Sequence, residues 1–172
     1  MKRTILAFGI AIALLLSASG CGGLNKDEQK AAKSIAKVFA GAKPSKEGQK
    51  IADCFSEKLV KDVGVEQLQK DKIIDKKLVA AASVPKKLSK KSAEAYGDGV
   101  VTCIDYTKIK GDIKKQSGAT SAQVDAYTKC FDAIDDDDLK QAIVDEYTQT
   151  KPTALVKKVN AKTQACGKKL GG

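Results

Sequence analysis

The sequence contains no histidine and no tryptophan, only one methionine, and aromatic residues at 5% of its 172 positions. Histidine is the usual general base near neutral pH and the commonest metal ligand in proteins. Its absence excludes Ser-His-Asp triads and Cys-His dyads. Catalysis by a serine-lysine pair remains chemically possible, but lysine is so frequent in this sequence that no serine-lysine spacing identifies a catalytic pair. We therefore expect a protein that is not an enzyme and that binds no cofactor.

Arginine is almost as scarce, because Arg3 is the only one in the chain. A planar guanidinium reads guanine edges and clamps phosphates, whereas the lysine ammonium is a compact, hydrated charge. The sequence also lacks a recognised nucleic-acid-binding signature and shows no alternation of aromatic with basic residues. We expect no nucleic acid partner.

The N-terminus has the organisation of an export signal. Lys2 and Arg3 precede an apolar run from Thr4 to Leu16, and small residues follow at 17–20. The apolar run is shorter than the roughly 20 residues of a membrane-spanning helix, and its flanks are those of a secretory signal peptide. We interpret residues 1–20 as a removable signal peptide.

The segment Ala18-Ser19-Gly20-Cys21 resembles the lipobox of bacterial lipoproteins, although Ala18 stands where that family usually has leucine. In that family, signal peptidase II cuts before the cysteine, whose sulfur receives a diacylglyceryl group and whose amine is often acylated too. The resemblance implies that Cys21 carries acyl chains such as palmitate. Residues 21–24 would then tether the protein to the extracytoplasmic face of the cell membrane. The alternative is ordinary cleavage that leaves Cys21 as a thiol.

Loss of the signal peptide leaves a strongly basic chain. Removing Lys2 and Arg3 from the 31 basic residues leaves 29, against 21 acidic residues, and hence a net charge of +8. Long-range attraction to anionic lipids or cell-wall polymers is favoured by such a charge.

A basic stripe directly follows the tether, since Lys26, Lys30, Lys33 and Lys37 recur at spacings of four, three and four. These spacings place the lysines on one face of a helix. The face is either a contact with an anionic membrane surface or an ordinary solvated surface whose opposite side packs on the domain. We favour the solvated surface.

The rest of the chain reads as helical, because apolar residues recur three and four positions apart from Asn25 onward. The helical domain covers residues 25–172. Predicted helices lie near 25–41, 45–62, 65–72, 89–108, 120–134, 139–147 and 152–166, and 73–88 is mostly loop. The second helix places Cys54 on its buried side. Gly97 and Gly99 mark close helix contact, and Pro152 fits the first turn of the last helix.

Four cysteines remain in the exported chain, namely Cys54, Cys103, Cys130 and Cys166. An even number in an oxidising compartment predicts two disulfides. Zinc is the competing use, but no C-x-x-C spacing or histidine supports it. A weak internal similarity, which includes "DCFSEKLV" and "KCFDAIDD", favours the pairs Cys54–Cys103 and Cys130–Cys166. The expected fold is a small all-α bundle of two related disulfide-tied helical units, with possible halves 25–117 and 118–172.

The acidic run from Asp135 to Asp138 has two interpretations. Calcium binding of the EF-hand type needs a glycine at the sixth position and a glutamate at the twelfth, and the run offers neither. Acidic residues at a helix start cap free amide groups and favour the positive end of the helix dipole. We expect capping and no metal site.

The chain also loosely resembles small exported bacterial lipoproteins with paired cysteines, a group whose activity is generally unassigned. We expect a lipid-anchored cell-envelope protein with a binding or structural role. Its partners would be the membrane, through Cys21, and an envelope protein or anionic polymer. An electrostatic binder of anionic lipids or cell-wall polymers, or a carrier of small apolar ligands, are the alternatives.

Overall fold

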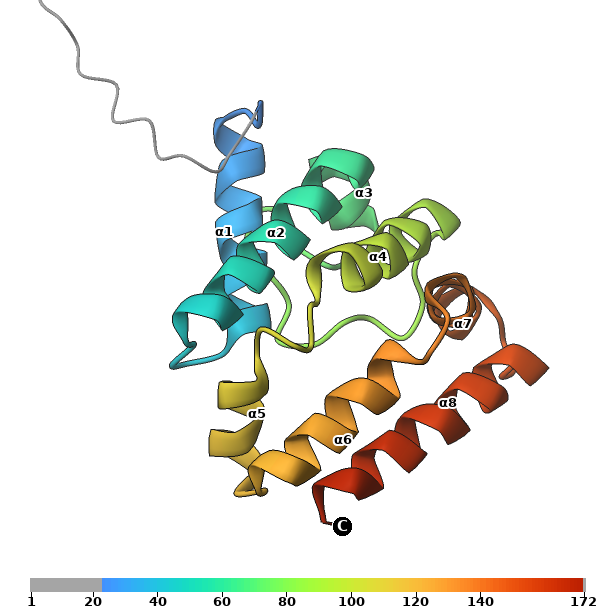
Figure 1. Ribbon diagram of the computed structural model, residues 1–172. Coiled ribbons are helices and arrows are strands. Elements are labelled where there is room, and N and C mark those ends of the chain that lie inside the picture. Colours follow the sequence, from blue (N-terminus) through green and yellow to red (C-terminus); the bar gives the residue numbers. More distant parts are fainter. Residues whose placement is uncertain (1–22, 172) are drawn as a thin grey trace, which may run out of the picture.

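The computed structural model describes residues 23–171, and within them the regular elements are all helices, with one isolated β-bridge (Figure 1). The expected all-α fold is confirmed. The signal peptide and Cys21 lie outside the described residues. The elements are α1 (Lys26–Ala40), α2 (Lys46–Val63), α3 (Val65–Lys70), α4 (Lys90–Cys103), α5 (Lys110–Ser117), α6 (Ser121–Asp132), α7 (Asp136–Thr148), α8 (Ala154–Gly167) and the short 3-10 helix η1 (Lys168–Leu170).

Side-chain caps set where most of these helices begin. Asn25 caps α1 in a capping box with Glu28. Thr120 and Gln123 form a second capping box at α6, whereas Ser45 and Ser89 cap α2 and α4 through their side-chain oxygens alone. Each cap oxygen accepts a backbone N–H that has no partner inside the helix, so local chemistry fixes these boundaries.

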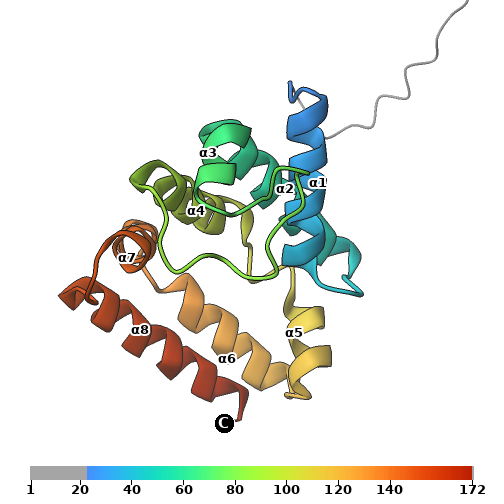
Figure 2. The same cartoon turned by 180° about the vertical axis from the view of Figure 1, so that it is seen from behind.

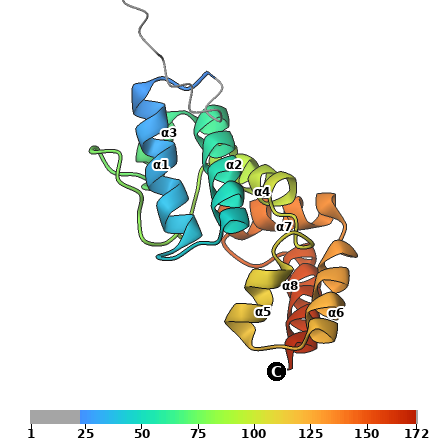
Figure 3. The same cartoon turned by 60° about the vertical axis from the view of Figure 1, so that its left-hand side comes forward.

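Helices α1 and α2 form an antiparallel pair, and α4 packs against the other side of α2 (Figure 3). Although α7 comes from the C-terminal part of the chain, it packs on α4. There the Lys140 ammonium lies 2.6 Å from the Asp98 carboxylate. Val144 joins the main core, whose centre is Phe55, Leu59 and Leu68.

Helix α3 belongs to this first layer, whereas α6, α8 and η1 form a second one in which α6 and α8 lie side by side (Figures 1 and 2). A small buried apolar cluster, made of Ala142 from α7 and Val156 and Val159 from α8, connects the second layer to α7. Helix α5 joins the layers, because the Ser45 hydroxyl donates to the Asp112 carboxylate and the Lys110 ammonium lies 2.7 Å from Asp125.

Both glycines of α4 face a neighbouring helix at close range, as predicted. A Cβ at Gly99 would lie 2.7 Å from Cδ2 of Phe55 on α2, and a Cβ at Gly97 would lie 3.1 Å from the Lys140 carbonyl oxygen on α7. A side chain at either position would push the helices apart. Glycine therefore lets α4 fit between α2 and α7.

The predicted disulfides are present: Cys54 of α2 is bonded to Cys103 of α4, and Cys130 of α6 to Cys166 of α8. However, the expectation that Cys54 lies on the buried side of its helix is wrong, because Cys54 is exposed. The buried stripe of α2 runs through Phe55, Leu59 and Val63. Cys54 precedes Phe55, about 100° around the helix axis, and so reaches Cys103 from the edge of this stripe.

Two boundaries differ from the sequence prediction because side chains offer the backbone another partner. The helix predicted to reach Lys108 ends at Cys103, where the Asp105 carboxylate accepts the Thr107 N–H at 3.0 Å and forms a turn instead. Thr153, and not Pro152, caps α8, so the proline precedes the helix. The sequence pattern also missed α5, a short helix with no buried residue.

The contact between Gly99 and Phe55 predicts an unusual response to alanine. Alanine normally stabilises a helix interior by up to about 1 kcal/mol relative to glycine. Gly99→Ala should instead lower the free energy of unfolding, because overpacking against a buried ring costs roughly 1–3 kcal/mol. Gly111→Ala is the matched control, since its Cβ would meet nothing within 4 Å. Urea unfolding of both variants measures the difference, and equal stability of Gly99→Ala and wild type would contradict this packing.

Candidate functional site

An apolar pocket opens between the C-terminal part of α1, the middle of α2 and the loop that precedes α4. Its volume is about 160 Å³. Nearly all of its lining side chains are apolar; they are Ile35, Val38, Phe39, Phe55, Leu59, Ile73, Ala80, Ala81, Ala82, Ser83, Val84, Pro85 and Tyr96. The pocket is comparable in size to engineered cavities of roughly 150 Å³ that take up benzene.

Aromatic rings form one wall of the pocket. The Phe39 ring stacks on Phe55, with ring centres 4.5 Å apart, and Tyr96 meets Phe55 edge to face at 5.0 Å. Phe55 is 1% exposed whereas Phe39 is 37% exposed. The stack therefore runs from the core to the surface, and the wall begins in the most firmly packed part of the protein.

The entrance of the pocket carries most of the conspicuous apolar surface. Only Val38, Phe39, Val79 and Val84 are exposed large hydrophobic residues in the described part of the chain. All of these except Val79 line the pocket. Apolar side chains gathered at one opening are typical of a binding site, whereas scattered ones carry no such meaning.

The loop over the pocket is hydrogen-bonded on both sides of residues 82–85, and its last residue, Leu88, donates its N–H to the Tyr147 carbonyl at 3.1 Å. The Ala80 N–H donates to Ser34 Oγ of α1 at 2.8 Å, and the Ala81 N–H donates to the Ile73 carbonyl at 2.9 Å. In contrast, residues 82–85 make no hydrogen bond within the described structure. A backbone segment without such bonds opens at low free-energy cost. Residues 82–85 are thus the adaptable side of the entrance.

A second, more open groove adjoins the pocket and shares Val38 and Ala80 with it. This groove has a volume of about 870 Å³, and its lining includes Lys33 and Lys37 of α1 together with Asp53 of α2. We call it the basic groove. The two hollows therefore place an apolar recess beside two cationic side chains.

The pKa of Tyr96, at the back of the pocket, is raised to about 12, because burial disfavours the phenolate and Tyr147 lies next to it. The ring centres of these tyrosines are 5.4 Å apart. Burial also raises the pKa of Tyr106 to about 12, in a cluster with Tyr127 and Phe131 beside α6. Both tyrosines stay neutral at physiological pH and serve as packing groups with a polar edge.

All four lysines of the basic stripe, Lys26, Lys30, Lys33 and Lys37, are exposed and form no ion pair within the described structure. The opposite face of α1, with Ala31, Ala32 and Ile35, is buried against the core. This face is therefore not available for insertion into a bilayer. Contact of the lysines with a membrane surface stays a prediction.

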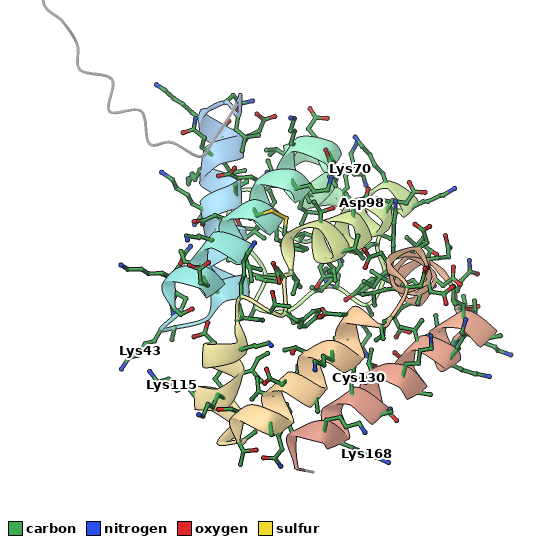
Figure 4. All side chains as sticks on the ribbon, viewed as in Figure 1. Lys43, Lys70, Asp98, Lys115, Cys130 and Lys168 are labelled. Carbon is green, nitrogen blue, oxygen red and sulfur yellow. A yellow bond between two sulfur atoms is a disulfide. The ribbon has the colours of Figure 1, made fainter. Side chains whose placement is uncertain are left out.

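Other exposed lysines are distributed widely: Lys43 lies in the loop between α1 and α2, and Lys70, Lys115 and Lys168 belong to α3, α5 and η1 (Figure 4). None of the described helices combines the length and the apolar character that crossing a bilayer requires. The lysines are thus spread over much of the described surface. The basic groove is distinctive because its lysines, Lys33 and Lys37, lie beside an apolar pocket.

The acidic run acts as a helix cap. The Asp135 side chain accepts the Asp138 N–H at 2.9 Å and so begins α7. Asp138 also lies 2.8 Å from the Lys158 ammonium of α8, and the hydrogen bond from this ammonium, together with its positive charge, lowers the pKa of the Asp138 carboxyl. Within residues 23–171, no group of three or more Cys, Asp or Glu side chains is arranged to hold a metal ion.

Sequence reasoning missed the pocket, because half of its lining comes from the loop at 73–88, which has no helical or strand periodicity. One signal was present: "LVAAASVP" is far more apolar than a solvated loop. A loop of that composition packs its apolar side chains against the rest of the protein or against a ligand.

Comparison of the chain with protein-family models, curated proteins and solved structures finds no match.

The raised pKa values predict how stability depends on alkaline pH. Burial raises the pKa of all four tyrosines above the ordinary value of 10, and the pKa of Tyr96 and of Tyr106 to about 12. A raised folded-state pKa favours the neutral form, so this stabilisation is complete below pH 10 and is lost as the pH rises toward 12. The free energy of unfolding should therefore fall across this interval.

An ultraviolet titration of phenolate, run with and without urea, measures the effect. Without urea the ionisation midpoint should lie above that of the unfolded chain. Coincident titration curves would contradict the burial of these rings.

Proposed function

We propose that this protein is a lipid-anchored, extracytoplasmic binding protein that takes up a small apolar ligand in the pocket of its helical domain. The observation that supports the ligand is the pocket itself, in which exposed Val38, Phe39 and Val84 surround an entrance that leads to buried Phe55. The observation that supports the anchor is the resemblance of Ala18–Cys21 to a lipobox.

A small ligand fits these dimensions better than a protein partner does. Stable protein interfaces bury roughly 800 Å² on each partner. Here the apolar exposure is confined to a few side chains around one opening, and the recess of about 160 Å³ accepts a single ring or a short alkyl segment. Burial of such a group supplies a free-energy gain without a wide complementary surface.

The proposed anchor and the pocket are compatible in space. Cys21 is four residues from Asn25, and an extended chain spans at most about 3.6 Å per residue. Val38 is 12 residues beyond Lys26 on α1, about 18 Å along the helix axis at 1.5 Å per residue. With α1 directed away from the bilayer, the pocket opens to the aqueous side of the envelope.

The anchor is tested by intact mass analysis of the protein extracted from membranes. The expected mass is that of a chain beginning at Cys21 with diacylglyceryl and acyl groups added, and with two hydrogens fewer for each disulfide. The unlipidated Cys21→Ser variant provides the matched control. An unmodified mature N-terminus, recovered in the soluble fraction, would show that the tether does not exist.

The pocket is tested by calorimetric titration of the mature chain carrying Cys21→Ser with toluene, a neutral apolar compound whose single ring matches the size of the recess. Val84→Asp places a carboxylate at the entrance, and because burial of a charge beside an apolar ligand is unfavourable, it should weaken binding at least tenfold. Ala126→Asp adds the same charge on α6, at an exposed position outside the pocket, and should leave binding unchanged.

Val84 is 38% exposed, so its replacement should not disturb folding. Circular dichroism of both variants provides the check. Equal toluene binding by Val84→Asp and Ala126→Asp, or no toluene binding by the chain without either substitution, would refute the proposed ligand site.

A further inference from the structure

The pocket and the basic groove are two parts of one surface depression, since Val38 and Ala80 line both of them. The pocket side is apolar, with Phe55 and Phe39 as its wall. The groove side presents the ammonium groups of Lys33 and Lys37. A ligand that filled both parts would need an apolar end and a charged end joined over a short distance.

The charge of the groove favours an anion. Lys33 and Lys37 are exposed and unpaired within the described structure, whereas Asp53 already accepts a hydrogen bond from Gln49 Nε2 at 2.8 Å. Two cationic groups against one carboxylate leave a net positive charge at this side of the depression. An anionic head would gain attraction there, and a cationic head would meet repulsion.

The sizes of the two parts favour a single alkyl chain. The pocket of about 160 Å³ accommodates one short alkyl segment, and two parallel chains would not enter it. The basic groove, at about 870 Å³, is open to solvent and has room for a hydrated head group. Lysine suits such a head, because its ammonium needs no fixed orientation toward a carboxylate or phosphate.

We infer that the ligand is a free, single-chain anionic amphiphile whose apolar tail occupies the pocket and whose head group lies between Lys33 and Lys37. This inference rests on the proposed function and adds the class of ligand. Within the lysine stripe, only Lys33 and Lys37 would then contact the ligand. Lys26 and Lys30 lie on the same face of α1 but line neither the pocket nor the groove.

The experiment compares decanoate, decanol and decyltrimethylammonium, which share a chain and differ in the charge of the head. Calorimetric titration of the mature chain carrying Cys21→Ser is performed at low ionic strength and below the concentrations at which these amphiphiles aggregate. Decanoate should bind about fivefold more tightly than decanol, and decyltrimethylammonium more weakly than decanol. Added salt should reduce the preference for decanoate.

Matched charge variants locate the head group. Lys33→Gln/Lys37→Gln should bring decanoate down to the affinity of decanol and leave decanol unchanged. Lys26→Gln/Lys30→Gln removes the same charge from the same helix face and should preserve most of the preference. Shortening the tail from decanoate to octanoate should weaken binding, by about fourfold for each methylene that leaves the pocket.

Each outcome separates this inference from the proposed function. Equal binding of decanoate and decanol, both lost in Val84→Asp, would overturn the anionic ligand and keep the apolar pocket. Equal effects of the two lysine pairs would also overturn it, because the attraction would then be unspecific. The chain is also tested with anionic phospholipid vesicles. If it binds the vesicles but none of the free amphiphiles, and Val84→Asp does not weaken this binding, the partner of the lysines is a membrane surface and the inferred free ligand is wrong. No binding of any of the three compounds would refute the proposed function itself.

Discussion

The contact between Phe55 and Gly99 is the constraint on which the rest of the structure depends. The Phe55 ring fills the space that a Cβ on α4 would occupy, so α2 and α4 approach closely and the disulfide from Cys54 to Cys103 closes beside them. The same ring stacks on Phe39 of α1 and forms part of the aromatic wall of the pocket. One side chain therefore joins three helices and shapes the candidate site, which gives the recess a wall as rigid as the core.

The opposite side of the recess is built differently, and this asymmetry suits a binding protein. Residues 82–85 form no hydrogen bond with any other residue from 23 to 171, while the Ala80 N–H is bonded to Ser34 of α1. A ligand would meet a preorganised aromatic wall and an adaptable loop. Preorganisation limits the entropy lost on binding, and local opening of the loop provides a route of entry.

Local features of this fold could be read from the sequence, and features that depend on distant contacts could not. The caps at Asn25, Ser45 and Ser89 were predictable because the cap oxygen and its N–H partners are neighbours in the chain. The all-α class followed from periodicity, and the disulfide pairing followed from internal similarity. The exposure of Cys54 was misjudged because one step around a helix moves a side chain by about 100°, which a loose apolar stripe does not resolve.

The candidate site was hidden for a related reason. Its wall comes from Phe39, Phe55 and Tyr96, each of which reads as an ordinary core residue on its own helix. Their convergence depends on the crossing of α1, α2 and α4, and the entrance depends on a loop without a period. The packing of α7 on α4 was likewise invisible, because Lys140 and Asp98 are far apart in the sequence.

The composition of the chain and the geometry of the site complement one another. A surface whose positive charge comes from lysine attracts anions over a distance but orients them poorly, because an ammonium lacks the fixed fork of a guanidinium. Selectivity must then come from something other than the charge. The apolar recess beside Lys33 and Lys37 supplies this selectivity, because the free energy of binding depends on how much apolar surface a ligand buries there, and hence on its length and width. Charge without fixed direction, joined to an apolar recess with one rigid wall, is the combination that the proposed ligand, with one apolar and one anionic end, requires.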